Sequence, residues 1–135
     1  MKRSLRRLVN ERAEHCCEYC GLPQALVPAL AFHVEHSIPR KHDGADTADN
    51  LALACYFCNL HKGPNLTGID SRTGQIAALF HPRRDSWKRH FRWDGPRLVG
   101  RTPTGRTTVR VLSINLPHRI RIRQRLIDAG LFPEA

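Results

Sequence analysis

The chain has 135 residues, of which 41% are hydrophobic, and its 22 Lys and Arg residues against 12 Asp and Glu residues give a net charge of +10. This length predicts one domain, residues 1–135, and the composition is typical of a globular protein rather than a disordered one. The apolar runs are too short to span a membrane and the basic N-terminus lacks the apolar segment of a secretory signal, so we expect a cytoplasmic protein.

The N-terminal part of the chain predicts two helices and two strands around a cysteine turn. Leu5, Leu8 and Val9 recur at the spacing of one helix face, and alternating apolar and polar residues indicate the first strand. Gly63 and Pro64 end the second helix. In chain order we expect a helix at 3–14, a turn at 15–21, strands at 31–35 and 51–54, and a helix at 58–62.

The C-terminal part of the chain contains two segments with competing patterns. Segment 107–112 has strand propensity, whereas Thr104 in front of it offers a helix cap, so both predictions stay open. Segment 119–123 alternates arginine and isoleucine like a strand, but Pro117 before it and Gly130 after it favour a longer helix. Strands are also expected at 76–80 and 97–99.

Two CxxC pairs form the most specific metal-binding pattern in the chain. They consist of Cys17, Cys20, Cys55 and Cys58. Zinc in structural sites takes four ligands in a tetrahedron, and a CxxC turn presents two sulfurs on the same side. We therefore predict one structural Zn²⁺ whose binding stabilises the fold.

A fifth cysteine, Cys16, lies directly before the first pair. Two equal CxxC spacings favour Cys17 over Cys16 as the ligand, and Cys16 is expected to be a packed side chain or a free thiol. A redox dithiol is the alternative interpretation, but one pair would suffice for it and no thioredoxin-like βαβ pattern surrounds either pair. The odd number of cysteines also disfavours a secreted disulfide framework.

The segment that contains these pairs resembles the signature of the HNH endonucleases. The matching residues are HVEHSIP at 33–39, Gly44, Asn50-Leu51 and CxxCNxxKG at 55–63. They are similar to the subgroup in which a four-cysteine zinc holds the motif together. The resemblance implies an α+β fold with a ββα-metal (HNH or His-Me finger) core at about 15–63, a zinc-knuckle clamp and a basic C-terminal extension, 64–135.

The resemblance also implies roles for four polar residues. His36 would be the general base that takes a proton from water, and Asn50 would fix the loop that positions it. Glu35 and Asn59 would bind a catalytic divalent metal, Mg²⁺ or another ion. The family usually has Asp or His where this chain has Glu35, a departure that alters the ligand geometry because Glu is longer by one methylene.

Each of these roles has a structural alternative. His33 lies on the same predicted strand face as Glu35 and is a further candidate metal ligand, a substrate contact or an ordinary surface histidine. His36 is otherwise a histidine at a strand end, and Asn59 is otherwise a residue that caps a helix.

The positive charge is unevenly distributed along the chain. Residues 64–135 carry 14 basic and five acidic side chains, whereas residues 1–63 carry eight and seven. Arginine pairs well with phosphate and dominates the extension, so we predict a nucleic-acid partner held mainly by the extension. The candidate phosphate contacts are Lys62, Arg83, Arg84, Arg121 and Arg125. A helix would distribute the arginines of segment 119–125 around its axis, so only some of them can face a duplex.

These features predict a metal-dependent endonuclease that hydrolyses DNA, expected to be double-stranded, and the family resemblance implies 5′-phosphate and 3′-hydroxyl products. The alternative is a zinc-stabilised DNA-binding module without turnover, which the unusual Glu35 favours. A nuclease directed to RNA is a third hypothesis. Trp87, Phe91 and Trp93 are expected either in the core or stacked on bases. The sequence does not predict an oligomeric state.

Overall fold

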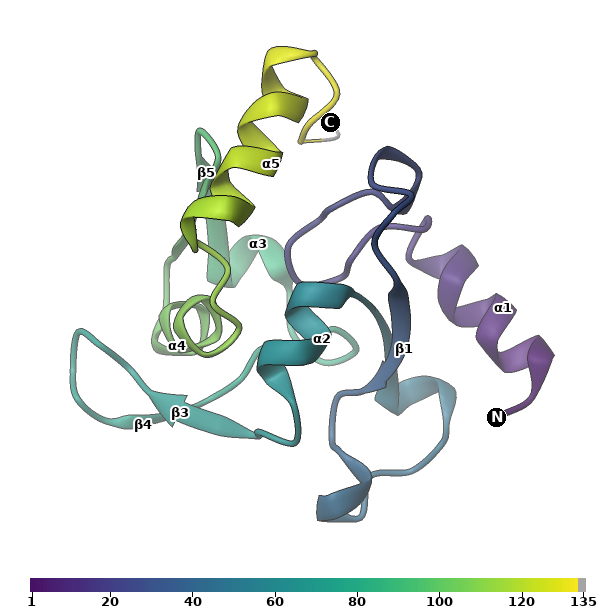
Figure 1. Ribbon diagram of the computed structural model, residues 1–135. Coiled ribbons are helices and arrows are strands. Elements are labelled where there is room, and N and C mark those ends of the chain that lie inside the picture. The colour runs from purple at the N-terminus through teal and green to yellow at the C-terminus, as the bar shows by residue number, and fades with distance from the viewer. Residues whose placement is uncertain (134–135) are drawn as a thin grey trace.

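Helices and short antiparallel strands alternate in the computed structural model, which describes residues 1–133 (Figure 1). The helices are α1 (Arg3–Arg12), α2 (Tyr56–Lys62), α3 (Trp87–His90), α4 (Pro103–Val111) and α5 (Pro117–Asp128), with 3-10 turns η1 (Gln24–Leu26), η2 (Arg40–His42) and η3 (Ala48–Asn50). The strands pair as β1 (Phe32–His36) with β2 (Leu51–Cys55), β3 (Thr67–Ile69) with β4 (Ile76–Ala78), and β5 (Phe91–Asp94) with β6 (Arg97–Gly100). This mixture confirms the predicted α+β class. No helix within residues 1–133 is long and apolar enough to cross a membrane.

The predicted ββα unit is formed by β1, β2 and α2. The two strands are antiparallel, with Phe32 opposite Cys55 and His36 opposite Leu51. The chain passes directly from β2 into α2, and Cys55 Sγ caps the helix by accepting a hydrogen bond from the backbone N–H of Cys58 at 3.5 Å. These elements differ from the predicted ones only at their ends.

Side chains cover the edge of β2 that faces away from its partner strand β1. Arg12 of α1 donates to the Leu51 carbonyl at 2.5 Å, and the Glu18 carboxylate accepts from the Leu53 N–H at 2.8 Å. Val9 packs against Leu51 and Leu53. Because an uncovered strand edge exposes unpaired backbone groups, α1 and the cysteine turn complete the hairpin.

Helix α4 occupies the region with competing patterns, so the strand alternative there is wrong. The cap is Thr102 rather than Thr104, because the Thr102 hydroxyl accepts a hydrogen bond from the Gly105 N–H at 3.0 Å. Pro103 follows the cap at the first helical position, where no backbone donor is needed. Gly105 permits close packing, since a Cβ at this position would lie 2.0 Å from the His90 carbonyl oxygen.

Helix α5 begins at Pro117, which confirms the helix favoured for this segment. The strand alternative for its arginine-rich part is wrong. The helical period divides the arginines between two faces. Arg119 and Arg123 are buried, each with 2% of its surface exposed, whereas Arg121 and Arg125 are exposed. The extension therefore uses part of its positive charge inside the fold.

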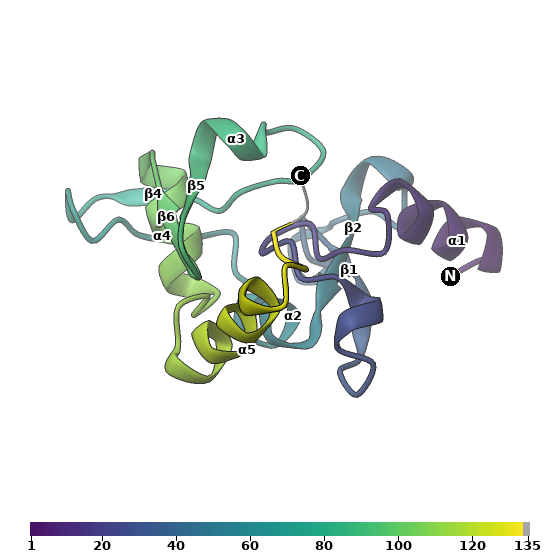
Figure 2. The ribbon, with the colours of Figure 1, turned by 90° about the horizontal axis from the view of Figure 1, so that it is seen from above.

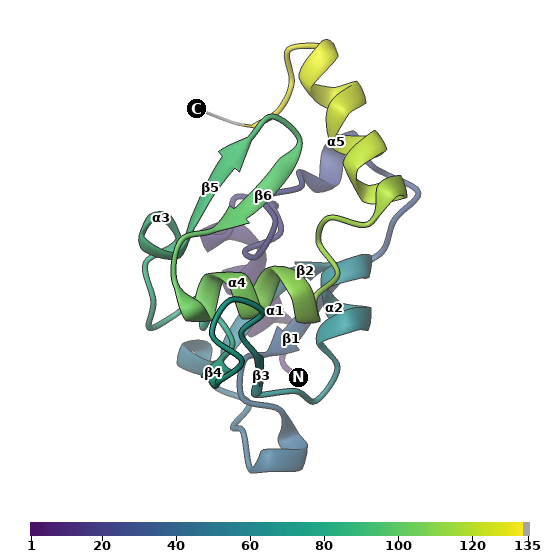
Figure 3. The same cartoon turned by 90° about the vertical axis from the view of Figure 1, so that its left-hand side faces the viewer.

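The C-terminal extension shares a hydrophobic core with the first cysteine turn. Its buried members are four of the cysteines together with Tyr19, Leu22, Ala54, Leu79, Phe80, Phe91, Leu98, Leu112 and Ile114. Figure 2 shows α5 beside α2, and Figure 3 shows the β5–β6 hairpin above α4. The extension thus packs onto the ββα unit rather than trailing from it.

Candidate functional site

Four buried cysteine sulfurs form a compact cluster between the cysteine turn and α2. The Sγ atoms of Cys17, Cys20, Cys55 and Cys58 all lie within 4.8 Å of one another, and those of Cys20 and Cys55 are 3.8 Å apart. A tetrahedral zinc with bonds of about 2.3 Å separates its sulfurs by about 3.8 Å. The four sulfurs and their spacing fit a structural zinc, because they supply all four ligands of the tetrahedron.

Local backbone geometry brings the first pair of sulfurs together. The Gly21 N–H donates to the Cys17 carbonyl at 2.9 Å, and Gly21 has a φ of +76°, a conformation that favours glycine. Cys16 lies outside the cluster, and its thiol contacts the Glu14 carbonyl at 3.5 Å. The cluster therefore contains Cys17, as the equal CxxC spacings predicted.

Arg119 of α5 reaches the cysteine cluster from the other side. Its Nη2 donates to Cys58 Sγ at 3.0 Å, and its Nη1 donates to the Leu112 carbonyl at 2.6 Å. Burial opposes its charged form, but the neighbouring thiolates outweigh burial and raise the pKa of Arg119 above its ordinary value. A zinc ion with four thiolates carries a net negative charge, so this buried guanidinium offsets part of it. In the sequence this arginine is only one positive charge among many.

His36, at the end of β1, is held by a carboxylate from the loop between β1 and β2. Its Nε2 lies 2.6 Å from Asp46 Oδ1, and Arg40 binds both oxygens of the same carboxylate at 3.0 Å. Hydrogen bonds from Arg40 and His36 lower the pKa of Asp46 to about 2. Because a carboxylate only accepts, the neutral form of His36 in this contact has its proton on Nε2 and its lone pair on Nδ1. Sequence reasoning missed Asp46 and Arg40.

Asn50 fixes this loop, as its place in the signature implied. Its side-chain oxygen accepts from the Ile38 N–H at 2.8 Å, and its amide donates to the Ile38 and Ala45 carbonyls at 2.9 Å. Gly44 is required at the crossing, because a Cβ there would lie 1.6 Å from the Ile38 carbonyl oxygen. The loop that carries Asp46 is therefore fixed from inside.

Glu35 points into the protein rather than toward an open metal site. Its carboxylate pairs with Lys62 Nζ at 3.0 Å and accepts a hydrogen bond from the Tyr19 hydroxyl. Lys62 also donates to the His36 carbonyl at 3.0 Å, and Glu35 and Lys62 are 7% and 1% exposed. Burial raises the pKa of Glu35, while the charge of Lys62 opposes that shift. This conformation does not support Glu35 as a metal ligand or Lys62 as a phosphate contact, contrary to expectation.

The remaining candidate metal ligands lie apart from a recognisable cluster. Asn59 is half-buried on α2, and His33 is exposed on β1. Within residues 1–133 the four cysteines are the only group of three or more His, Cys, Asp or Glu side chains close enough to share a metal. Among the described residues, the geometry therefore supplies no second group of this kind that could hold a catalytic cation.

The predicted phosphate contacts in the extension occupy different environments. Arg83 is half-buried and donates to the Glu18 carboxylate, whereas Arg84 is exposed. Arg121 and Arg125 project from α5, which lies at the opposite end of the molecule from the loop between β1 and β2 (Figures 1 and 3). Arg121 and Arg125 therefore do not form one surface with the loop that holds His36 (Figures 1 and 3).

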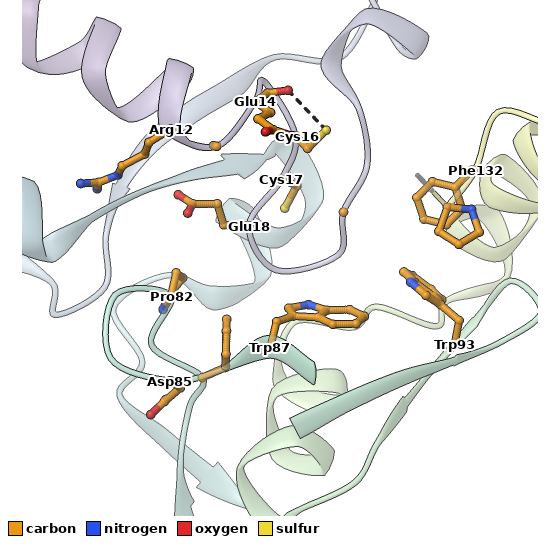
Figure 4. Close-up of a pocket in the computed structure, with 14 residues that line it drawn as sticks. Arg12, Glu14, Cys16, Cys17, Glu18, Pro82, Asp85, Trp87, Trp93 and Phe132 are labelled. Atoms are coloured by element: carbon orange, nitrogen blue, oxygen red, sulfur yellow. Dashed lines mark hydrogen bonds between the residues drawn. The ribbon is translucent and has the colours of Figure 1, made fainter. Parts of the chain in front are cut away.

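The aromatic residues of the extension divide between core and surface. Phe91 is buried, with 1% exposed, while Trp87 and Trp93 are half-buried. Trp87 Nε1 donates to the Tyr19 carbonyl at 2.8 Å. Trp87 and Trp93 line a hollow of about 470 Å³ opposite the cysteine turn, with Phe132 at one end (Figure 4). Packing thus accounts for Phe91 and anchors Trp87.

Comparison with known proteins finds a family match for the ββα unit. Residues 17–65 match the family model described as HNH endonuclease. No curated protein matches the chain, and no solved structure matches it. The matched segment contains both CxxC pairs, His36, the loop with Asp46, and Asn59.

Proposed function

We propose, from the match of residues 17–65 to the HNH endonuclease family model, that the chain hydrolyses phosphodiester bonds of DNA with His36 as the general base. The observation that carries the proposal is the contact of His36 Nε2 with Asp46 at 2.6 Å. It gives the histidine a fixed orientation and a fixed tautomer. The family implies a nucleic-acid substrate, and double-stranded DNA is the substrate we propose.

The chemistry assigned to His36 follows from this geometry. Hydrolysis requires a water that loses a proton as it attacks the phosphorus. The Nδ1 lone pair of His36 takes that proton, and Asp46 stabilises the imidazolium that forms. Arg40 keeps Asp46 ionised and in place through its two hydrogen bonds. General-base catalysis of this kind contributes on the order of 10²- to 10⁴-fold in rate.

A divalent cation such as Mg²⁺ would stabilise the phosphate charge and the leaving oxygen when bound. The predicted ligands Glu35 and Asn59 do not fit it in this conformation, because the Glu35 carboxylate is already bound to Lys62 and Tyr19. Metal dependence is thus proposed from the family alone. The steps that the geometry supports are those of His36, Asp46 and Arg40.

The buried Glu35–Lys62 pair also favours a second candidate function. A zinc-stabilised DNA-binding module without turnover needs the fold, the zinc and a basic surface, but no ligand set for a catalytic cation. In that case the ββα unit positions DNA and His36 is a structural residue. This candidate predicts that the protein cleaves no DNA, whichever divalent metal is added.

A nicking assay separates the two functions. Zinc-loaded protein is incubated with supercoiled plasmid in Mg²⁺ or Mn²⁺, beside His36→Ala protein of equal zinc content. The proposal expects nicked plasmid only with the native histidine. Plasmid that is bound but stays intact in both metals favours the binding module. A parallel incubation with RNA tests the third hypothesis, which faster RNA cleavage would support.

A further inference from the structure

A groove joins the start of α1 to the loop that holds His36. It encloses about 570 Å³ and is lined by Met1, Lys2, Leu5, Asp46, Thr47 and Ala48. Asp46, which lines the groove, contacts His36 at 2.6 Å. Figures 1 and 3 both show the N-terminus beside the loop between β1 and β2. Residues of α1 are thus neighbours of the candidate catalytic histidine, although they lie far from it in sequence.

Lys2 lines this groove, and the two segments that form it, α1 and the loop between β1 and β2, carry further exposed cations. Lys2, Arg3 and Arg6 are exposed, and within residues 1–133 the structure records no ion pair for any of them. Lys2 and Arg6 are four residues apart and share one side of α1. On the loop side, Lys41 of η2 adds an exposed cation beside Arg40, which is exposed but already paired with Asp46, and the same loop carries the exposed acids Asp43 and Asp49. We name Lys2, Arg3, Arg6, Arg40 and Lys41 the α1–loop surface.

The near-neutral charge of residues 1–63 conceals this surface. Four of the seven acids in that segment have cationic partners, since Glu11 pairs with Arg7, Glu18 with Arg83, Glu35 with Lys62, and Asp46 with Arg40. Glu18 and Glu35 are also largely withdrawn from solvent. Three of these pairs use a cation of the same segment and leave its net charge unchanged, and within residues 1–133 the cations of this surface with no recorded ion pair are Lys2, Arg3, Arg6 and Lys41.

Part of the positive charge of the extension is likewise buried or paired, although ten of its 14 basic side chains are exposed. Arg119 and Arg123 are buried, and Arg106 is held by both oxygens of Asp70 at 2.8 and 2.9 Å. The exposed Arg121 and Arg125 project from the end of the molecule opposite the His36 loop (Figure 3). Lys2 lines the same groove as Asp46, the carboxylate that contacts His36, whereas α5 lies at the opposite end of the molecule from that loop (Figure 3).

We propose that the α1–loop surface binds the backbone of duplex DNA. Lys2, Arg3 and Arg6 contact phosphates next to the phosphodiester bond that is cleaved at His36. This inference rests on the proposed nuclease function for its meaning, but its binding test does not require turnover. The main contribution to DNA affinity then comes from α1 and η2 rather than from the C-terminal extension.

The test compares two triple variants that each remove three positive charges. The first is Lys2→Gln, Arg3→Gln, Arg6→Gln, and the matched control is Arg97→Gln, Arg121→Gln, Arg125→Gln, all exposed residues. Both are made in His36→Ala protein, and binding of a short duplex is measured from low to moderate salt. Equal zinc content and equal melting temperature establish that both variants are folded.

The α1 variant is expected to reduce the slope of log affinity against log salt by about 2.7, at about 0.9 for each phosphate that is no longer neutralised. The control is expected to change the slope by less than about 0.9, the value for a single phosphate. Equal slopes for the α1 variant and its parent, or a larger change in the control, would overturn the proposal. A greater loss of affinity for duplex RNA than for DNA would overturn the choice of DNA.

Cleavage by the same triple variants with His36 intact keeps the two proposals distinguishable. If the α1 variant loses affinity while native protein never nicks DNA, the surface stands and the nuclease function fails. If native protein nicks DNA and the α1 variant binds as tightly as its parent, the nuclease function stands and the surface fails.

Discussion

Replacement of Lys62 by Met tests whether the Glu35–Lys62 pair is structural. The Lys62 ammonium is 3.0 Å from Glu35 and 3.0 Å from the His36 carbonyl, and the lysine is 1% exposed. Met fills a similar volume but leaves the Glu35 carboxylate buried without its counter-charge. Breaking a buried pair in this way costs roughly 3–5 kcal/mol.

The assay is thermal unfolding of zinc-loaded protein. A chain of this size loses roughly 3–4 °C of melting temperature per kcal/mol, so Lys62→Met should melt roughly 10–20 °C lower. Lys41→Met is the matched control, because Lys41 is exposed and its replacement should change stability by at most about 0.5 kcal/mol. The double variant Glu35→Gln, Lys62→Met should recover part of the loss, since no buried charge remains.

Equal melting temperatures for Lys62→Met and Lys41→Met would refute this reasoning. They would show that the Glu35 carboxylate does not depend on Lys62. Glu35 would then be available to a divalent cation, and the metal-ligand role that the family resemblance implied would regain its support.

Three further outcomes are expected from the described contacts. Asp46→Asn should slow single-turnover cleavage by about 10- to 100-fold while DNA affinity holds, because His36 loses its orienting partner; an unchanged rate would remove Asp46 from the mechanism. Arg40 and His36 lower the pKa of Asp46 to about 2. The ionised Asp46 therefore stabilises the fold fully above the ordinary carboxyl pKa near pH 4, and this stabilisation is lost as the pH falls toward 2. The stability of Asp46→Asn should lack this pH dependence, as acid unfolding curves of the two proteins would show. Arg119→Gln should release zinc to a chelator about 10- to 100-fold faster than Arg121→Gln, and equal release rates would count against charge compensation.

The sequence predicted the parts of the fold that depend on nearby residues. Helical and strand periods, the glycine and proline stops, and two equal CxxC spacings are local patterns, and they located the ββα unit and the cysteine cluster. Asn50 and Gly44 followed from the family resemblance. The backbone contacts of Asn50 and the crowding at Gly44 now give both a physical reason.

The missed features are contacts between distant parts of the chain. Tyr19 meets Glu35, and Arg119 meets Cys58, across 16 and 61 residues. No pattern of spacing indicates such pairs, so the sequence analysis placed Lys62 among the candidate phosphate contacts and did not anticipate that Arg119 is buried against the cysteine cluster. Strand β5 was missed because its aromatic residues alternate with charges that also suited a binding surface. The Thr102 cap was missed because Thr104 offered the same side chain nearby.

The most direct test of the central claim is the single-turnover cleavage rate of a duplex by zinc-loaded protein, compared with His36→Ala protein at saturating concentrations. We predict cleavage in Mg²⁺ or Mn²⁺ that falls by on the order of 10²- to 10⁴-fold in the variant, with zinc content and DNA affinity preserved. Cleavage at the native rate by His36→Ala, or no cleavage by native protein that binds the duplex, would contradict the assignment of His36 as the general base of a nuclease.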